Sequence, residues 1–202
     1  MSIMGSNDRT TTDNLADRIR DSAYEDIRRF GVLGLRVTRV ANRAHCSVTQ
    51  IYRHFGDRDG LLADVLARIF EQISIQTIEF FRTSLLAKPE VRVRDIVELL
   101  PTPSGVRKRE ESLLRAQILA VASTNPTLHS RLEEIVARNY PRWVENCEIA
   151  ESRLAPGEHF DRRVIFIVLM NSNLYYNSLL GGNMVTDEQY REFMHDILSS
   201  RR

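Results

Sequence analysis

The chain has 202 residues, of which 43% are apolar and 27% are charged, and its formal net charge at pH 7 is +1. These values are typical of a globular protein of one or two small domains, and the balanced charge excludes a uniformly basic nucleic-acid-binding chain. The longest apolar run, residues 164–170, is too short to span a membrane, and residues 1–14 lack the apolar core of a signal peptide. We therefore expect a cytoplasmic protein with no membrane partner.

Helical periodicity begins near the N-terminus. Apolar residues recur every four positions from Leu15 to Ile27, which predicts a first helix over residues 13–30 with Asp13 as its N-cap. Residues 1–12 precede this helix and are expected to form a flexible arm. Apolar residues at the i, i+3, i+4 and i+7 spacing predict a second, shorter helix over residues 37–44.

A tight turn is expected directly after the second helix, at His45 and Cys46. Ser47 follows, and Gln50 stands three residues later, which is the pattern of a capping box. This pattern predicts a third helix over residues 48–55. Two short helices joined by a tight turn form a helix-turn-helix pattern.

The third helix has two chemically different faces. Val48, Ile51 and Phe55 fall on one side at about 100° per residue, whereas Thr49 and Arg53 point away from that side. Such a helix can pack on a small core with its apolar side and offer hydrogen-bonding groups to a DNA major groove with the other.

The charge of the helix-turn-helix region supports this interpretation. Residues 36–56 contain four arginines, two histidines and no acidic residue. The planar guanidinium group suits phosphates and guanine edges. We therefore expect double-stranded DNA as a partner.

The rest of the chain also shows helical periodicity, and no segment reads as a strand. The expected helices cover residues 13–30, 37–44, 48–55, 57–86, 91–100, 106–123, 127–154, 159–180 and 186–199. Pro141 is expected to kink the helix in which it lies. The sequence thus predicts an all-α fold of about nine helices, with a DNA-binding domain over residues 13–56 and a second helical domain over residues 57–202.

Residues 38–62, TRVANRAHCSVTQIYRHFGDRDGLL, resemble the DNA-binding segment of the TetR family of bacterial transcriptional regulators. The likeness is carried by Val40-Ala41, Ser47, Ile51-Tyr52, His54-Phe55, Arg58 and Leu61-Leu62. The remaining chain matches the family only in the number and length of its helices. The sequence contains no phosphate-binding loop, no Ser-His-Asp context and no zinc spacing, so we expect no enzyme, no metal and no cofactor.

The helix pattern and the resemblance together assign a set of DNA contacts. These residues are Arg36, Thr38, Arg39, Ser47, Thr49, Gln50, Tyr52, Arg53, His54 and Arg58. His45 stands where the family's turn commonly has glycine, so we expect it to adopt the left-handed region. Arg36 stands where the second helix commonly has a Thr or Ser cap, so we expect a weaker cap there. Gln50 receives two functions, the cap and a base contact, that compete for one amide.

The resemblance implies a homodimer that forms through the last two helices. The helix over residues 159–180 is apolar nearly all round, which is consistent with burial on two sides. A central core helix in a monomer would show the same pattern. Helix-turn-helix dimers read two half-sites about one DNA turn apart.

The resemblance also implies a small-molecule pocket in the C-terminal domain. Candidate lining residues are Phe70, Ile73, Phe81, Gln117, Tyr140, Trp143, Phe166, Met170, Asn173 and Tyr176. Their aromatic and amide groups favour a moderately apolar effector with a hydrogen-bonding group, although each residue would also suit core packing. We therefore expect a repressor that its ligand releases from operator DNA. A ligand-independent regulator, an activator and a redox sensor that uses Cys46 and Cys147 are the alternatives.

Overall fold

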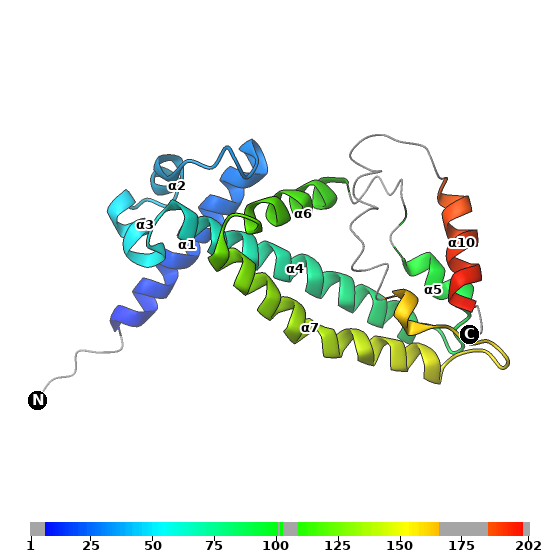
Figure 1. The fold of residues 1–202 in the computed structure, drawn as a ribbon. Coiled ribbons are helices and arrows are strands. Elements are labelled where there is room, and N and C mark those ends of the chain that lie inside the picture. Colours follow the sequence, from blue (N-terminus) through cyan, green and yellow to red (C-terminus); the bar gives the residue numbers. More distant parts are fainter. Residues whose placement is uncertain (1–6, 101, 103–108, 166–185, 200–202) are drawn as a thin grey trace, which may run out of the picture. The chain divides into compact units, whose positions relative to one another are not determined.

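The computed structural model describes residues 7–100, 102, 109–165 and 186–199 and is all-α over these residues (Figure 1). The named helices are α1 (Asn7–Phe30), α2 (Val37–Arg43), α3 (Val48–Phe55), α4 (Arg58–Leu86), α5 (Val93–Leu99), α6 (Arg109–Ala122), α7 (Pro126–Ser152) and α10 (Asp187–Ser199). Instead of a sheet, the described chain has a single isolated bridge between Val91 and Leu154. The predicted all-α class is confirmed.

The chain divides into two compact units. The first unit contains Met1–Glu71 and Gln117–Glu133, and the second contains Gln72–Ala116 and Glu134–Arg202. Helices α4, α6 and α7 each contribute residues to both units. The boundary that the sequence suggests at residue 56 stays a prediction.

Helix α1 contributes one apolar side to the core of the first unit. Its residues Ile19, Ala23 and Ile27 are buried, as the predicted four-residue stripe requires. The prediction that Asp13 caps the helix is wrong, because α1 already begins at Asn7. Residues 7–12, which we assigned to an arm, contain no glycine or proline to end the helical turns. Phe30, the last residue of α1, is 54% exposed.

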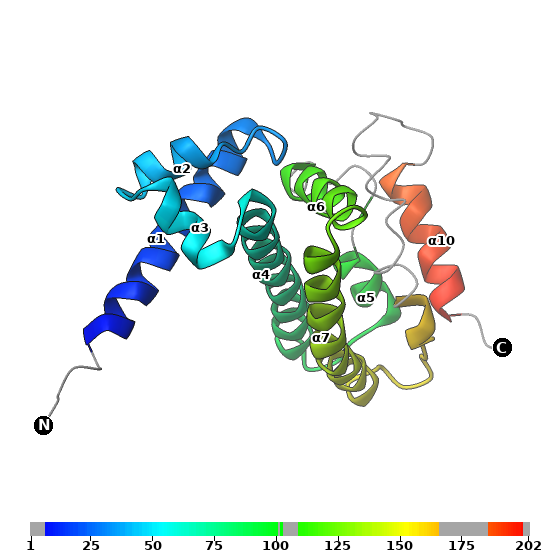
Figure 2. The same ribbon diagram turned by 60° about the vertical axis from the view of Figure 1, so that its left-hand side comes forward.

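Helices α2 and α3 pack on α1 and on each other (Figure 2). Ala41 of α2 and the C-cap residue Ala44 are both buried, which is what two short helices need in order to approach closely. Ile51 of α3 is fully buried in the same core. Gly56 then ends α3 with φ of 83°, a left-handed conformation that glycine adopts without strain. The predicted bounds of α2 and α3 are confirmed to within one residue.

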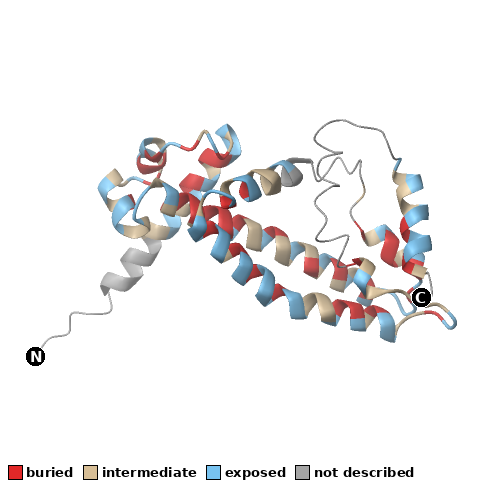
Figure 3. Cartoon of the chain, in the orientation of Figure 1, coloured by how far each residue is buried: buried red, intermediate tan, exposed pale blue. Residues whose placement is uncertain are grey.

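The second unit has its own apolar core. Figure 3 shows buried residues along one side of α5 and α10, and these two helices lie side by side in Figures 1 and 2. The core consists of Phe81, Leu85, Val91, Val93, Ile96, Val97, Leu100, Cys147, Ala150, Ile165, Met194 and Leu198. Helix α10 is therefore held through its buried side by α5.

Two sequence predictions for the C-terminal half have different outcomes. Thr186 and Gln189 form the predicted capping box of α10, with Gln189 N donating to Thr186 Oγ1 at 3.2 Å and Thr186 N donating to Gln189 Oε1 at 3.0 Å. Of the helix predicted over residues 159–180, residues 162–165 are helical and residues 166–180 lie outside the described part. Pro141 lies inside α7, and the kink predicted there stays a prediction. No helix in the described ranges is long and apolar enough to cross a membrane.

Candidate nucleic-acid interface

The start of α3 is built by a reciprocal capping box between Ser47 and Gln50. The Gln50 N–H donates to Ser47 Oγ at 3.1 Å, and the Ser47 N–H donates to Gln50 Oε1 at 2.9 Å. Each bond satisfies a backbone donor that the first turn of a helix leaves without an intrahelical partner. The predicted capping box is confirmed, and it fixes the residue at which α3 begins.

The turn before α3 contains the one non-glycine residue with positive φ in the described chain. His45 has φ of 51°, as expected for a residue that replaces glycine. The Cys46 N–H donates to the Ala41 carbonyl oxygen at 3.0 Å and closes the turn over the end of α2. The prediction for His45 is therefore confirmed.

The two faces of α3 differ as the sequence predicts. Ile51 is fully buried, and Val48 and Phe55 are half-buried beside it. Thr49, Tyr52 and Arg53 are exposed, and because they are three and four residues apart they share one side of the helix. The guanidinium of Arg20 lies 5.5 Å from the centre of the Phe55 ring and holds the end of the apolar face. The structure thus exposes these three polar side chains, and their contact with DNA stays a prediction.

Two of the four arginines in residues 36–56 are held by α1. Arg39 Nε and Nη2 donate to the carboxylate of Asp26 at 2.8 and 2.9 Å. The same guanidinium lies 4.2 Å from the centre of the Phe30 ring, which explains why this exposed ring is still in contact with protein. Arg43 Nη1 donates to the carbonyl oxygen of Ser22 at 2.8 Å. Both side chains therefore have a structural function in this conformation.

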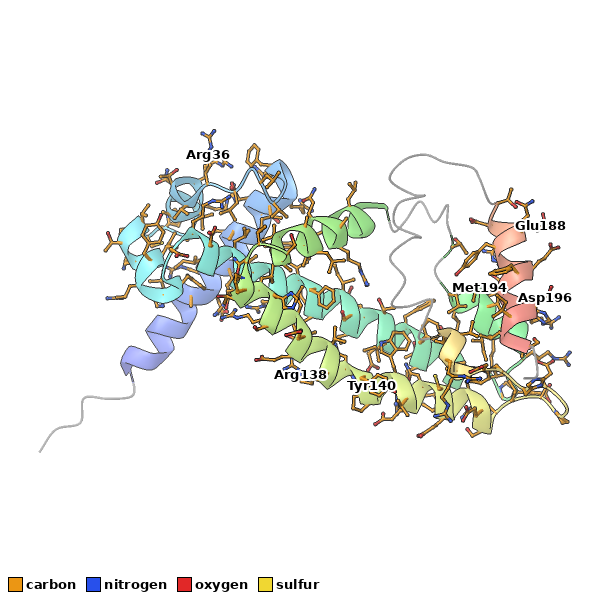
Figure 4. The ribbon with its side chains drawn as sticks, viewed as in Figure 1. Arg36, Arg138, Tyr140, Glu188, Met194 and Asp196 are labelled. Carbon is orange, nitrogen blue, oxygen red and sulfur yellow. The ribbon has the colours of Figure 1, made fainter. Side chains whose placement is uncertain are left out.

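The other two arginines, Arg36 and Arg53, have no side-chain partner among the residues that the structure describes. In Figure 4 the side chain of Arg36 extends away from the helices. It makes no cap for α2, as the sequence predicts. These two guanidinium groups are available for an anionic partner, whereas Arg39 and Arg43 are not.

Asp26 is the residue that sequence reasoning missed. Its side chain is fully buried, and besides Arg39 it accepts from the Arg36 N–H at 3.0 Å, so it supports the start of α2 from a different helix. Burial alone would raise the pKa of Asp26, but the hydrogen bonds from Arg39 and from the Arg36 N–H, with Arg43 nearby, outweigh it and hold the pKa below its usual value. An acidic residue within the apolar stripe of the first helix was the available signal.

The remaining predicted DNA contacts are less uniform. Thr38 is exposed on α2, and Arg58 at the start of α4 pairs with the neighbouring Asp59 at 3.4 Å. His54 is half-buried, its ring centre lies 6.2 Å from that of Phe55, and its buried Nε2 has no partner in the described chain. His54 therefore turns partly toward protein.

A second ionic cluster lies in the first unit around Asp64 of α4. Arg20 Nε donates to its carboxylate at 2.7 Å and Arg131 Nη1 donates at 2.9 Å. Burial would raise the pKa of Asp64, but these two arginines outweigh it and hold the pKa below its usual value. The cluster connects α1, α4 and the first turns of α7.

The structure brings two of the predicted ligand residues together in the second unit. Phe81 and Trp143 meet edge to face, with ring centres 5.1 Å apart. They border a small cavity of about 10 Å³, roughly the space of one water molecule. Asn146 borders it as well; its Nδ2 donates to the Ile78 carbonyl oxygen at 3.0 Å, and its buried Oδ1 has no partner in the described chain.

Asn139 is a second buried amide on the same helix, and its Nδ2 also lacks a partner among the described residues. It precedes Asn146 by seven residues, so both side chains lie on one face of α7. The sequence carried a signal for this pair, because both asparagines interrupt the apolar stripe that Leu132 and Ile135 begin.

Other predicted lining residues lie elsewhere. Tyr140 is 55% exposed on α7 and points outward in Figure 4, so its predicted place in a pocket is not supported. Gln117 belongs to the first unit, where its Oε1 accepts from the Val32 N–H at 3.3 Å. Ile73 is buried and Phe70 is half-buried on α4. Four candidates lie outside the described residues: Phe166, Met170, Asn173 and Tyr176.

Both cysteines are free thiols. Burial raises the pKa of Cys46, and burial raises the pKa of Cys147 to about 11. A raised pKa keeps a thiol protonated and unreactive. Among the described residues, no group of three or more His, Cys, Asp or Glu side chains is placed to hold a metal ion.

Comparison with known proteins gives a uniform result for the fold. No family model matches the sequence, and no curated protein matches it. A protein from Rhodococcus sp., described as a TetR-family transcriptional regulator, is 22% identical with a TM-score of 0.57, over 93% of this chain and 100% of that chain. A second TetR-family protein, from Mesorhizobium loti, is 16% identical with a TM-score of 0.59, over 92% of this chain and 94% of that chain.

A third solved structure was determined with a small molecule. This transcriptional regulator from Saccharomonospora viridis, in complex with choline, is 18% identical with a TM-score of 0.59, over 92% of this chain and 98% of that chain. The chain has the fold of TetR-family regulators. The resemblance that residues 38–62 carry is thereby confirmed at the level of the fold, and these identities establish no more than the fold.

Proposed function

We propose that this chain is a sequence-specific DNA-binding transcriptional regulator, and that it represses its target until a small-molecule ligand releases it from operator DNA. The observation that carries the proposal is the contrast between the buried side and the exposed side of α3. Its apolar side is fixed by the buried Ile51, while the Tyr52 and Arg53 side chains remain exposed on the other side without a hydrogen-bond partner in the described part of the chain, in a fold that solved transcriptional regulators share.

Each group on the exposed side of α3 suits one part of a DNA duplex. The Arg53 guanidinium can donate two parallel hydrogen bonds to guanine O6 and N7. The methyl group of Thr49 can contact a thymine methyl, and the Tyr52 hydroxyl can bind a phosphate or a base edge. Arg36 and Arg58 supply charge for phosphates. We leave Arg39 out of the proposed contacts, because Asp26 and Phe30 already hold it.

Binding to the chain's own upstream DNA tests the DNA-binding function. Arg53→Ala should weaken binding to that DNA about tenfold to a hundredfold, since a bidentate guanine contact contributes roughly 1–3 kcal/mol. Arg82→Ala is the matched control, because it removes the same charge from an exposed arginine of the second unit that pairs with Glu145. Equal losses in both variants, or no preference over shuffled DNA at moderate salt, would refute sequence-specific binding.

We further propose that the regulator is a homodimer that forms through its last two helices. Helix α10 supports this part, because Met194 and Leu198 are buried against α5 while Phe193 and Ile197 remain exposed. In Figure 4 Met194 lies on the side of α10 that faces α5, and Glu188 and Asp196 lie on the outer side. A twofold dimer would give the two recognition helices half-sites about one DNA turn apart.

The proposed ligand site is the interior of the second unit beside Trp143. The buried Asn139 and Asn146 amides each have one polar atom without a partner among the described residues, and they would bind the hydrogen-bonding group of a moderately apolar effector. The cavity of about 10 Å³ is too small for such a molecule, so binding requires that the helices around it move apart. A ligand that binds this opened state better would shift the equilibrium away from the DNA-binding state.

A screen for release of labelled operator DNA tests the ligand-binding part, with choline among the compounds because it occupies a regulator of the same fold. A releasing compound should lose its effect on Asn146→Leu, which fills the site without an amide. Release that persists unchanged in this variant would place the ligand elsewhere. A reporter with the operator placed over or upstream of a promoter would separate a repressor from an activator.

A further inference from the structure

The oxygen and the nitrogen of the Gln50 side-chain amide have different surroundings. Its oxygen accepts two hydrogen bonds from Ser47, one from the backbone N–H at 2.9 Å and one from the side-chain hydroxyl at 3.2 Å. An amide oxygen has two lone pairs, so these two donors use its accepting capacity. The donor at 2.9 Å is a backbone N–H, which also decides that the oxygen and not the nitrogen faces Ser47.

The other end of the same amide is uncommitted. Gln50 Nε2 has no hydrogen-bond partner among the residues that the structure describes. It carries two N–H donors and no lone pair that can accept. Seen from a partner, Gln50 is therefore a donor only, although an unattached glutamine offers both a donor and an acceptor.

Base pairs differ in the major groove by their donors and acceptors. Adenine presents the N7 acceptor beside the N6 donor, so the bidentate glutamine–adenine contact needs the amide oxygen as well as the amide nitrogen. Guanine presents two acceptors, N7 and O6, side by side. Gln50 can satisfy guanine with Nε2 alone, whereas a bidentate contact with adenine would break the bonds that start α3.

We infer that Gln50 is a specificity-determining residue that favours guanine, with its two acceptors, over adenine, with one, because the capping box occupies the acceptor that a bidentate adenine contact needs. The inference rests on the proposed function, namely that α3 enters a major groove. The neighbouring Arg53 is also a pure donor, and residues 36–56 contain no acidic side chain. The operator half-site under α3 should therefore be rich in guanine.

Selection of binding sites from a random-sequence DNA duplex library tests the inference with the full-length protein. The wild type is compared with Gln50→Ala, and the base position whose preference Gln50→Ala abolishes is assigned to Gln50. We expect guanine at that position in the wild type. Replacement of this guanine by 7-deazaguanine, which lacks the N7 acceptor, should weaken wild-type binding roughly threefold to tenfold, the effect of losing one hydrogen bond.

Gln50→Glu provides the matched variant. One carboxylate oxygen keeps both bonds from Ser47, so α3 should retain its start, and the helical content and thermal midpoint should match the wild type. The second oxygen replaces the amide donors by an acceptor, which pairs with the N4 donor of cytosine. The selected base at this one position should change from guanine to cytosine, while the position assigned to Arg53 keeps its preference.

The outcomes separate the inference from the proposed function. Adenine at the Gln50 position of the wild type, or no change of preference in Gln50→Ala, would overturn the inference while DNA binding stands. A library that yields no enriched sequence would overturn both, since the proposed function itself would then fail. Guanine in the wild type together with cytosine in Gln50→Glu would establish the inference.

Discussion

Helices α3 and α10 begin with the same device and expose different chemistry. Each starts with a hydroxyl residue and a glutamine three positions later, and in both the two reciprocal bonds measure between 2.9 and 3.2 Å. Beyond that start, α3 exposes Thr49, Tyr52 and Arg53, whereas α10 exposes Phe193 and Ile197.

The difference shows that the start of a helix and its function are encoded separately. A capping box determines where a helix begins, and it does so equally well for a polar and for an apolar exposed face. The partner is determined by what the surrounding protein leaves unpaired. Among the described residues around α3 those groups are the donors of Gln50 and Arg53, which favours a nucleic acid, whereas α10 adds the exposed apolar pair Phe193 and Ile197 to its charged outer residues, which favours a second protein surface.

The largest expected effect comes from Asp26, which holds α2 and thereby supports the packing of the neighbouring α3. Asp26→Ala leaves Arg39 without its carboxylate, and we expect a loss of about 3 kcal/mol in the free energy of unfolding. This is the lower end of the range for a broken buried pair, because the Arg39 side chain is 31% exposed. Chemical unfolding measures the loss, and amide exchange should rise in α2 and α3 but not in α10. Asp21→Ala, an exposed acidic residue of the same helix, should be silent.

The next effect concerns α10 and two neighbouring residues. Met194 is 3% exposed and Phe193 is 60% exposed. Met194→Ala should lower the free energy of unfolding by about 2–3 kcal/mol through loss of core packing. Phe193→Ala should change it by less than about 0.5 kcal/mol, yet should weaken dimerisation as measured by sedimentation at several concentrations. Unchanged dimerisation in Phe193→Ala would remove α10 from the proposed interface.

Acid should destabilise the first unit through two carboxylates that are paired with arginines, Asp26 and Asp64. The pKa values of Asp26 and Asp64 lie below the ordinary value of about 4. Their stabilisation is therefore fully present above about pH 4 and is lost as the pH falls through the lower folded-state pKa values. Thermal unfolding midpoints measured between pH 6 and pH 3 should decrease once the pH is lower than about 4. The fall should be less steep in Asp26→Asn, and an equal slope would contradict this assignment.

The smallest of these effects tests the shared device directly. Ser47→Ala and Thr186→Ala each remove the hydroxyl of one capping box, and each should cost about 1 kcal/mol of helix stability. Amide exchange at the start of α3 and of α10 measures the two losses. Only Ser47→Ala should also change the base preference of the protein, because it removes one of the two donors to Gln50 Oε1 and returns one lone pair to that oxygen, while the backbone N–H bond stays. A change of base preference in Thr186→Ala would break the distinction between the two helices.

Sequence alone predicted the parts of this site that depend on neighbours in the chain. The capping box of α3 follows from two residues three positions apart, so its pattern is local, and the left-handed His45 follows from its place in the turn of the family that the segment resembles. The fate of the arginines was not predictable in this way, because it depends on Asp26, which lies 13 residues before Arg39 and on another helix. Arg39 and Arg53 look alike in the sequence, and only the folded chain separates a paired cation from an unpaired one.

The exposure of Phe30 also depends on a contact from another helix, which the neighbouring residues in the sequence do not indicate. An aromatic residue at the end of an apolar stripe predicts a buried ring. The Phe30 ring is instead exposed, and it contacts the guanidinium of Arg39 on α2. In the second unit, the cavity beside Trp143 depends on residues of α4, α5 and α7 together. Periodicity identified these helices without indicating which of their aromatic residues would meet.

The dependence of α2 on Asp26 has a consequence for folding. Helix α2 has seven residues and no side-chain cap of its own, and the N–H of its N-cap residue Arg36 is bonded to a carboxylate of α1. A helix this short is unstable alone in water. An isolated peptide of residues 31–56 should therefore be unstructured, and the smallest fragment able to present the recognition helix must include α1. We therefore expect this region to fold in a single cooperative event, in which docking onto α1 precedes or accompanies the formation of the exposed face of α3.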